Sequence, residues 1–198
     1  MSILIFANGV MVDVEWTRPF FDHASLVIAA DGGSRHLHRL QRQPDLVIGD
    51  MDSVPADVLA WLEAGDATLI RHDPMKDETD LELALLQAQQ VAGVDDEILL
   101  FGTLGGRMDH MLANVLLLAS PALAESRIQL VEGQERAWLI RDHCQFAAQP
   151  GDVVSLLPIG GDVLVRQRRA CAGLCMTVCW CFGQARGVSN EATAVPFP

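Results

Sequence analysis

Four short motifs rich in aspartate recur in the first half of this 198-residue chain. They are Ala30-Asp31-Gly32-Gly33, Gly49-Asp50-Met51-Asp52-Ser53, Lys76-Asp77-Glu78-Thr79-Asp80 and Gly105-Gly106-Arg107-Met108-Asp109-His110. Three of them come after an apolar run typical of a buried strand. Because the carboxyl ends of parallel strands meet at one edge of a sheet, we expect the acids that follow them to converge there, namely Asp31, Asp50, Asp52 and Asp109. Grouped carboxylate oxygens suit a hard cation such as Mg²⁺ together with substrate phosphates.

Glycines and an arginine beside these acids add a phosphate-binding pattern. Gly32-Gly33, Gly102 and Gly105-Gly106 allow backbone N–H groups to approach phosphate oxygens closely. A helix that begins near Asp109 would present its positive end, and Arg107 can clamp a phosphate with two parallel hydrogen bonds. The chain contains neither a G-x-x-x-x-G-K-[ST] P-loop nor a G-x-G-x-x-G fingerprint. We therefore expect a nucleotide to be held differently from those two classes.

Each acid also has a structural interpretation. Asp77 or Thr79 would cap the helix expected over 78–92, Asp80 matches a first-turn acid, and Asp109 could equally cap a helix. Asp50 and Asp52 are unusual in a simple turn, because two acids at one strand end repel each other. Taken jointly, the motifs favour a functional site.

Strands and helices alternate through the first part of the chain. Strands are expected over residues 3–7, 26–30, 46–49, 67–70 and 97–101, and helices between the first two strands, from Pro55 through Leu62, over 78–92, and through Asn114 to Pro121. This predicts an α/β fold, with an N-terminal doubly wound, mostly parallel sheet domain over residues 1–126. Short alternating segments punctuated by glycine and proline come next, and they predict a smaller all-β sandwich domain over residues 127–198.

Composition limits the partners. The net charge of −12 argues against a nucleic-acid binder, since no basic stripe is present to displace phosphate counterions. The apolar N-terminus lacks a basic leader, so it indicates a first strand and not a signal peptide. The longest other apolar run, Met111 to Ala119, is far below the roughly 20 residues that span a bilayer. We expect no membrane span and a cytoplasmic location.

In order and spacing over residues 3 to 120, the four motifs resemble the signature of thiamine pyrophosphokinases, also called thiamine diphosphokinases. Val154-Ser155-Leu156-Leu157-Pro158 and Gly187-Val188-Ser189-Asn190 are similar to C-terminal landmarks of that family. The resemblance implies Mg²⁺-dependent transfer of the pyrophosphoryl group of ATP to thiamine, which yields thiamine diphosphate and AMP. It also implies an α/β ATP-binding catalytic domain, a β-sandwich thiamine-binding domain, and a homodimer with thiamine sites between subunits.

The resemblance also implies a role for each motif residue. The catalytic candidates are Asp50, Asp52, Asp77 and Asp80, and the metal candidates are Asp50, Asp52 and Asp80. The nucleotide-binding candidates are Asp31, Gly32, Gly33, Arg107, Asp109, His110 and Asn114. The thiamine-binding candidates are Asp52, Asp80, Ser189 and Asn190. Which acid serves as the general base stays open.

Other functions fit parts of the pattern. The run Asp50-Met51-Asp52-Ser53-Val54 also resembles haloacid-dehalogenase-like phosphatases, in which Asp50 would be the covalent nucleophile and Asp52 the acid/base. That class needs a downstream lysine and a further acidic pair. Lys76 is the only lysine, and Asp95-Asp96 precede a strand where those acids should follow one. A metal-dependent glycosyltransferase explains fewer motifs, and a thiamine- or nucleotide-binding module with impaired turnover is the non-enzyme alternative.

The stretch from Arg168 to Cys181 departs from the family pattern, which has a strand resembling Gly-Leu-x-Trp-Pro-Leu there. It contains four cysteines, Cys171, Cys175, Cys179 and Cys181. One interpretation is a cysteine metal or redox site, and another is a variant strand in which Trp180 replaces the family's tryptophan. The third is a pair of compensating frameshifts that bracket residues 167–181. Codons can be chosen for residues 168–180 that encode Glu-Gly-Leu-Arg-Trp-Pro-Leu in a neighbouring frame, so resequencing the coding DNA tests this hypothesis.

Overall fold

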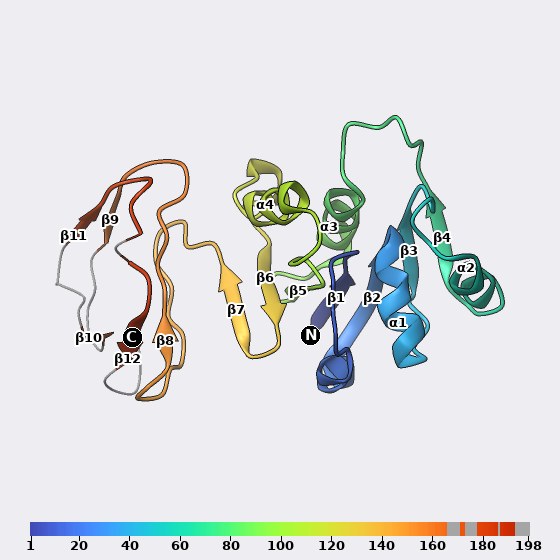
Figure 1. Ribbon diagram of the computed structural model, residues 1–198, viewed down its shortest axis with the longest axis horizontal. Coiled ribbons are helices and arrows are strands. Elements are labelled where there is room, and N and C mark those ends of the chain that lie inside the picture. Colours follow the sequence, from blue (N-terminus) through green and yellow to red (C-terminus); the bar gives the residue numbers. More distant parts are fainter. Residues whose placement is uncertain (166–170, 173–177, 186, 193–198) are drawn as a thin grey trace. The chain divides into compact units, whose positions relative to one another are not determined.

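The chain divides into two compact units, Met1–Leu139 and Ile140–Pro198, each described here by itself (Figure 1). The computed structural model describes residues 1–165, 171–172, 178–185 and 187–192. Of the residues proposed from the sequence, Cys175 lies outside this described part, as does much of the stretch 167–181.

A mostly parallel sheet with strand order β4-β3-β2-β1-β5-β6-β7 forms the centre of the first unit (Figure 1). Its strands are β1 (Ser2–Phe6), β2 (Ala24–Ala30), β3 (Leu46–Gly49), β4 (Thr68–Arg71), β5 (Glu97–Phe101), β6 (Arg127–Glu132) and β7 (Glu135–Trp138). Strands β1 to β6 are parallel, and β7 pairs antiparallel with β6. The five strands expected from apolar runs are confirmed as β1 to β5.

Helices cover both faces of this sheet, as the doubly wound expectation requires. On one face, α3 (Asp80–Val91) and the end of α4 (Met108–Leu117) pack against Ile3 and Ile5 of β1. On the other face, α1 (Ser34–Leu40), α2 (Ala56–Glu63) and the 3-10 helix η1 (Glu15–His23) pack against Leu4 and Phe6. A short 3-10 turn, η2 (Asp31–Gly33), precedes α1, and another, η3 (Pro121–Leu123), follows α4. Because neighbouring residues of β1 point to opposite faces, its continuous apolar run fills both cores.

Local sequence explains how two of these elements begin. The side chain of Thr79 caps α3 by accepting a hydrogen bond from the backbone N–H of Glu82 at 3.2 Å, so Thr79 and not Asp77 is the cap. The helix expected between β1 and β2 is the 3-10 helix η1, which contains Pro19. Proline lacks the N–H that an α-helical interior needs, which favours this tighter local form.

The boundary between the two units falls later in the chain than the sequence predicted. The expected boundary lay after residue 126, whereas the structure divides the chain between residues 139 and 140. The reason is that β6 pairs with β5, and β7 with β6, so both strands complete the first sheet. Ile128 and Leu130 of β6 are buried in the first unit's core. Their alternating pattern identified a strand correctly but could not say which sheet it joins.

The second unit contains only short antiparallel pairings among its described residues. One sheet has the order β10-β12-β8, with β8 (Val153–Val154), β10 (Cys171–Ala172) and β12 (Asn190–Ala192). The other pairs β9 (Val163–Val165) with β11 (Val178–Trp180). A smaller all-β part after the α/β part is therefore confirmed. In the described ranges of the whole chain, no helix is long and apolar enough to cross a membrane.

Candidate functional site

The sheet topology places four loops along one edge of the first unit. Neighbouring strands β3, β2, β1 and β5 are parallel, so the loops after them share the carboxyl edge. The strand order also reverses there, because the chain goes from β1 to β2 on one side while β5 lies on the other. In open α/β sheets, ligands bind in the crevice at such a switch point. The fold therefore directs attention to the loops that carry the acidic and glycine-rich motifs.

Three carboxylates meet at this edge. Oxygens of Asp31, Asp50 and Asp52 all lie within 4.8 Å of one another. Asp50 and Asp52 belong to one turn, in which Asp50 Oδ1 accepts a hydrogen bond from the Asp52 backbone N–H at 3.0 Å. Met51 between them is 6% exposed and has a φ of 69°, so the chain turns sharply enough for both acids to face Asp31. The convergence predicted for these three acids is observed.

Asp31 is the most deeply placed member of the group. It is 3% exposed, and its Oδ1 has no hydrogen-bond partner within the described ranges. Burial raises the pKa of Asp31 above its ordinary value, and the charges of Asp80 and Asp50 act in the same direction. Hydrogen bonds from the Gly32 backbone and the Ser53 side chain work against this rise. A bound cation would offset the repulsion and supply the missing partner.

Asp80 reaches the same place from the first turn of α3. A Cβ built on Gly49 would lie 3.1 Å from Asp80 Oδ1 and 2.7 Å from Asp31 Cβ, so only glycine leaves room between the two acids. Asp80 Oδ1 lies 2.6 Å from Nζ of Lys76. That ammonium group is 13% exposed at its side chain and holds one positive charge at the edge of the acidic group. Asp77 is exposed, in the segment between Lys76 and the helix cap.

The loop after β5 holds its residues in a different arrangement from the one predicted. Arg107 and Asp109 form a two-pronged pair, with 3.1 Å from Nε to Oδ1 and 2.6 Å from Nη2 to Oδ2. The arginine hydrogen bond lowers the pKa of Asp109 to about 2. Asp109 thus pairs with Arg107 and does not belong to the group formed by Asp31, Asp50 and Asp52. His110 is exposed, and its backbone N–H donates to Asp109 Oδ1 at 2.9 Å.

Asn114 and the glycines shape this loop. The Asn114 side chain donates to the carbonyl oxygen of Thr103 at 2.8 Å and thereby ties α4 to the loop. Gly105 and Gly106 have φ values of 75° and 77°, a backbone region that side chains with a Cβ disfavour. The glycine pair is exposed, so its N–H groups lie at the surface of the sheet edge.

Gly32 and Gly33 are buried and serve close packing. A Cβ on Gly33 would overlap the carbonyl oxygen of Phe6, and a Cβ on Gly32 would meet the side chain of Asn8. These glycines let the turn after β2 press against the end of β1. Their observed role in this structure is to position Asp31.

The loop after β1 is a part of the edge that the sequence interpretation missed. Its Gly9 backbone N–H donates to the Gly102 carbonyl at 2.7 Å, which joins it to the loop after β5. Helix α1 braces it, because Arg35 donates to the carbonyls of residues 8 and 9, and Arg39 to those of residues 11 and 12. His36 Nε2 lies 2.9 Å from the Gly9 carbonyl, and burial lowers the pKa of His36 to about 4. The available signal was Asn8-Gly9 directly after a strand.

Two of the thiamine-binding candidates, Ser189 and Asn190, lie in the second unit. The Asn190 amide donates to the Gly187 carbonyl at 2.7 Å and to the Val154 carbonyl at 3.2 Å. The Ser189 backbone N–H donates to the Ser155 side chain at 3.0 Å, and Ser189 itself is exposed with a φ of 61°. These contacts hold the two sequence landmarks of this unit together and present Ser189 at the surface.

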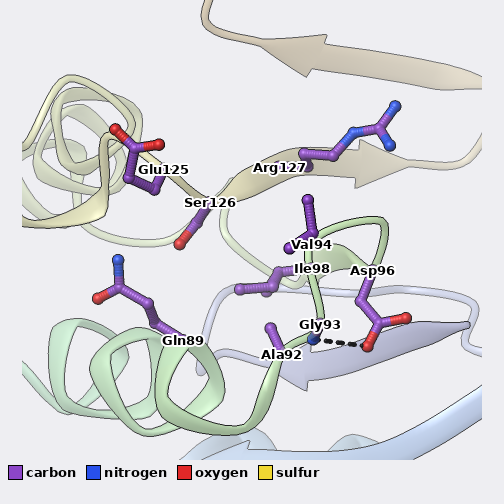
Figure 2. A pocket seen from close by; sticks show the side chains of 9 residues that line it. All are labelled: Gln89, Ala92, Gly93, Val94, Asp96, Ile98, Glu125, Ser126 and Arg127. Carbon is purple, nitrogen blue, oxygen red and sulfur yellow. Dashed lines mark hydrogen bonds between the residues drawn. The ribbon is translucent and has the colours of Figure 1, made fainter.

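A surface cavity lies at the opposite edge of the first unit. It has a volume of about 180 Å³ and is formed where α3 ends and where β5 and β6 begin. Figure 2 shows Asp96, Glu125 and Arg127 among its lining residues, and the Gly93 backbone N–H bonded to Asp96. Because ligands in this class of sheet bind at the carboxyl ends of the strands, the cavity is not our candidate site.

Comparisons with known proteins identify a common family. A family profile described as "Thiamin pyrophosphokinase, catalytic domain" matches residues 17–131. Thiamine pyrophosphokinase of Bacillus subtilis is 33% identical over 133 residues, which cover 67% of this chain and 61% of that relative. Thiamine pyrophosphokinase 1 of Arabidopsis thaliana is 31% identical over 124 residues, which cover 52% of this chain and 46% of that relative.

The fold is also that of a solved relative. The crystal structure of thiamine pyrophosphokinase from Bacillus subtilis matches with a TM-score of 0.84 at 24% identity, covering 98% of this chain and 91% of that one. The sequence matches therefore span 61% and 46% of the lengths of these two curated relatives, while the structural match extends over nearly the whole chain.

Proposed function

This chain belongs to the thiamin pyrophosphokinase family, and on that premise we propose that it is a thiamine diphosphokinase. The proposed reaction transfers the pyrophosphoryl group of ATP to the hydroxyl oxygen of thiamine. That oxygen bonds to the β-phosphorus, the bond between this phosphorus and the α–β bridging oxygen breaks, and AMP leaves. The hydroxyl proton passes to a carboxylate, so the products are thiamine diphosphate and AMP.

The observation that supports this proposal most directly is the group formed by Asp31, Asp50 and Asp52, whose oxygens lie within 4.8 Å of one another. Hard oxygen donors at this spacing, with a buried Asp31 oxygen that lacks a partner among the described residues, fit a magnesium ion. We propose that Asp50, Asp52 and Asp80 hold the metal, and we add Asp31 because its oxygen lies within 4.8 Å of those of Asp50 and Asp52. When bound, Mg²⁺ would supply positive charge that offsets the charge of the transferring phosphates. Asp77, in the same motif, is the further catalytic candidate.

We place the nucleotide along the carboxyl edge, from the acidic group to the loop after β5. Adjacent strands lie about 4.8 Å apart, so the distance from β3 to β5 is roughly 14 Å, which suits an extended ligand and not an isolated ion. Arg107 would exchange its exposed bond with Asp109 for a phosphate contact, and Gly105-Gly106 would donate backbone hydrogen bonds. Gly32, Gly33, His110 and Asn114 complete the nucleotide candidates.

The remaining parts of the proposal follow from the family. Thiamine would contact Ser189 and Asn190 together with Asp52 and Asp80, and a homodimer would carry thiamine sites between its subunits. In support of a dimer, α4 exposes an apolar row, Met108, Leu112 and Leu116. Light scattering on the purified protein tests the dimer. We assign the reaction to the cytoplasm, where ATP and Mg²⁺ are available.

The decisive experiment incubates the purified chain with Mg²⁺, ATP and thiamine and separates the products by chromatography. Equimolar AMP and thiamine diphosphate are expected. Asp52→Asn should reduce turnover by at least about 100-fold, because it removes one of the few ligands that fix the metal. Asp57→Asn, an exposed acid in the first turn of α2, is the matched control and should leave turnover unchanged.

The alternative products refute the proposal in different ways. ADP would indicate transfer of a single phosphoryl group, and inorganic phosphate without thiamine diphosphate would indicate a hydrolase. Binding of ATP and thiamine without any product would indicate a binding module. Each result contradicts diphosphokinase activity.

A further inference from the structure

A second group of possible metal ligands lies in the C-terminal unit, away from the acidic motifs in sequence. It consists of Asp162, Cys179 and Cys181, whose carboxylate oxygen and two sulfur atoms all lie within 4.8 Å of one another. Neither cysteine is in a disulfide. The sequence drew attention to the cysteines but not to Asp162, which precedes them by many residues.

The strand register explains why these three side chains meet. Trp180 of β11 pairs with Val163 of β9 in an antiparallel ladder. The residues one step further along, Cys181 and Asp162, therefore stand opposite each other, on the face away from Trp180. Cys179 points to the same face as Cys181, because side chains two apart on a strand share a face. Trp180 is 7% exposed, so its burial fixes which face carries the thiols.

One further contact holds the carboxylate in place. The backbone N–H of Phe182 donates to Asp162 Oδ1 at 2.8 Å. This bond orients the carboxylate toward the residue beside Cys181. Metal ligands fixed by such an outer hydrogen bond bind more tightly than unrestrained ones.

The donor set selects the kind of cation. Two sulfurs and one carboxylate oxygen suit a soft or borderline ion such as Zn²⁺ or Cd²⁺, whereas Mg²⁺ prefers oxygen alone. Ligands of a tetrahedral zinc site lie roughly 3.3 to 3.8 Å apart, given bond lengths near 2.0 to 2.3 Å. Donor atoms already within 4.8 Å can reach this spacing by small side-chain rotations. Because Asp162 and Cys179 are exposed and Cys181 is half-buried, the fourth position would be open to water.

We propose that Asp162, Cys179 and Cys181 form a binding site for a thiophilic divalent cation, separate from the acidic group of the first unit. The site combines Asp162, directly before β9, with Cys179 of β11 and Cys181, directly after it, so a bound ion would link the two strands. This is a site for a different ion class from the one proposed for catalysis. It does not depend on the proposed enzymatic function.

The test is a titration of the full chain with Cd²⁺ under a non-thiol reductant, followed by ultraviolet absorption. Bonds between thiolate and cadmium give a charge-transfer band that carboxylate ligands do not produce. Peptide mass mapping first verifies that Cys179 and Cys181 are present in the purified protein. We expect one equivalent of Cd²⁺ to bind with this band, even in a large excess of Mg²⁺.

Variants assign the band to the proposed ligands. The double variant Cys179→Ser, Cys181→Ser should lose it, and Asp162→Asn should weaken binding by about tenfold or more, since losing even an outer partner of a ligand costs that much. Cys144→Ser keeps the cluster and should match the parent protein. Three results would overturn the proposal. They are no band in the parent protein, a band that persists in the double variant, or a peptide that lacks the two cysteines.

Discussion

The exchange Asp31→Asn probes the conflict between stability and metal binding at the acidic group. Asp31 is 3% exposed and its Oδ1 lacks a partner among the described residues. A buried acceptor without a partner costs about 1 to 3 kcal/mol. An asparagine amide offers donors to the neighbouring carboxylates, and asparagine tolerates the φ of 45° found at this position. The variant should therefore be more stable than the parent by about 1 to 3 kcal/mol in the absence of metal.

Thermal unfolding in EDTA at pH 7 measures this effect. For a chain of this size, each kcal/mol moves the midpoint by about 2 to 4 °C, so a rise of roughly 2 to 12 °C is expected. In saturating Mg²⁺ the order should reverse, because only the parent retains the full set of charged ligands. Turnover of ATP and thiamine should fall in the variant by at least about 100-fold.

The pH dependence has a definite sign. The pKa of Asp31 is raised in the folded protein, so ionising this group costs folding free energy as pH rises through the folded value. Below the ordinary value both states are protonated, and the advantage of the variant over the parent should vanish. At higher pH the advantage should be complete.

Asp45→Asn is the matched control. Asp45 Oδ2 accepts a hydrogen bond from the Val27 backbone N–H at 2.7 Å, so this carboxylate already has a strong partner. The exchange should be neutral or destabilising by up to about 1 kcal/mol. If Asp31→Asn also lowers the midpoint in EDTA, the reasoning from buried charge is refuted.

Three further predictions concern the residues around the site. In urea unfolding, Lys76→Gln should destabilise the metal-free protein by about 1 kcal/mol and the Mg²⁺-bound protein by less, since the ion replaces the lost charge. Equal losses in the two states would contradict this. The control Arg71→Gln, at the exposed 3.7 Å pair with Glu63, should change the unfolding free energy little. Gly33→Ala should lower the unfolding free energy by more than about 3 kcal/mol, because its Cβ would overlap the carbonyl oxygen of Phe6. Gly161→Ala, where a Cβ meets nothing within 4 Å, should be near neutral, and comparable losses in the two variants would refute the packing argument. His36→Gln should reduce the loss of unfolding free energy that the parent shows at acid pH. The pKa of His36 is about 4 in the folded protein and 6.5 ordinarily, so the parent loses up to about 3 kcal/mol as pH falls through that interval. An unchanged pH dependence of the unfolding free energy, measured in urea between pH 4 and 7, would show that His36 does not titrate this way.

Part of the site could be predicted because strand ends are recognisable in a sequence. The apolar runs before Asp31 and Asp50 identify buried parallel strands, and the loops after parallel strands lie at one edge of the sheet. The same rule failed for Asp109, which pairs with Arg107 in the first turn of α4. A longer loop separates it from its strand, and over that distance the chain direction depends on packing. Asp80 reaches the acids from a helix, which no strand-end rule predicts.

The smaller unit was harder to predict for a different reason. Its strands are short, so alternation alone does not say which pair with which. Strand β6 shows the same problem, because its pattern fits either unit and only its pairing with β5 assigns it to the first. Asp162 illustrates the gain from the register, which places it opposite Cys181 across a strand pair.

The sequence by itself determined the fold class, the acidic motifs and the family, because apolar periodicity and motif spacing are local properties of the chain. Tertiary structure alone decided that Asp80 joins the acidic group, that Asp109 does not, and that α1 braces the loop after β1. These facts depend on contacts between residues far apart in the chain. Distances of a few ångströms between such residues arise only when the sheet order and the helix packing are in place.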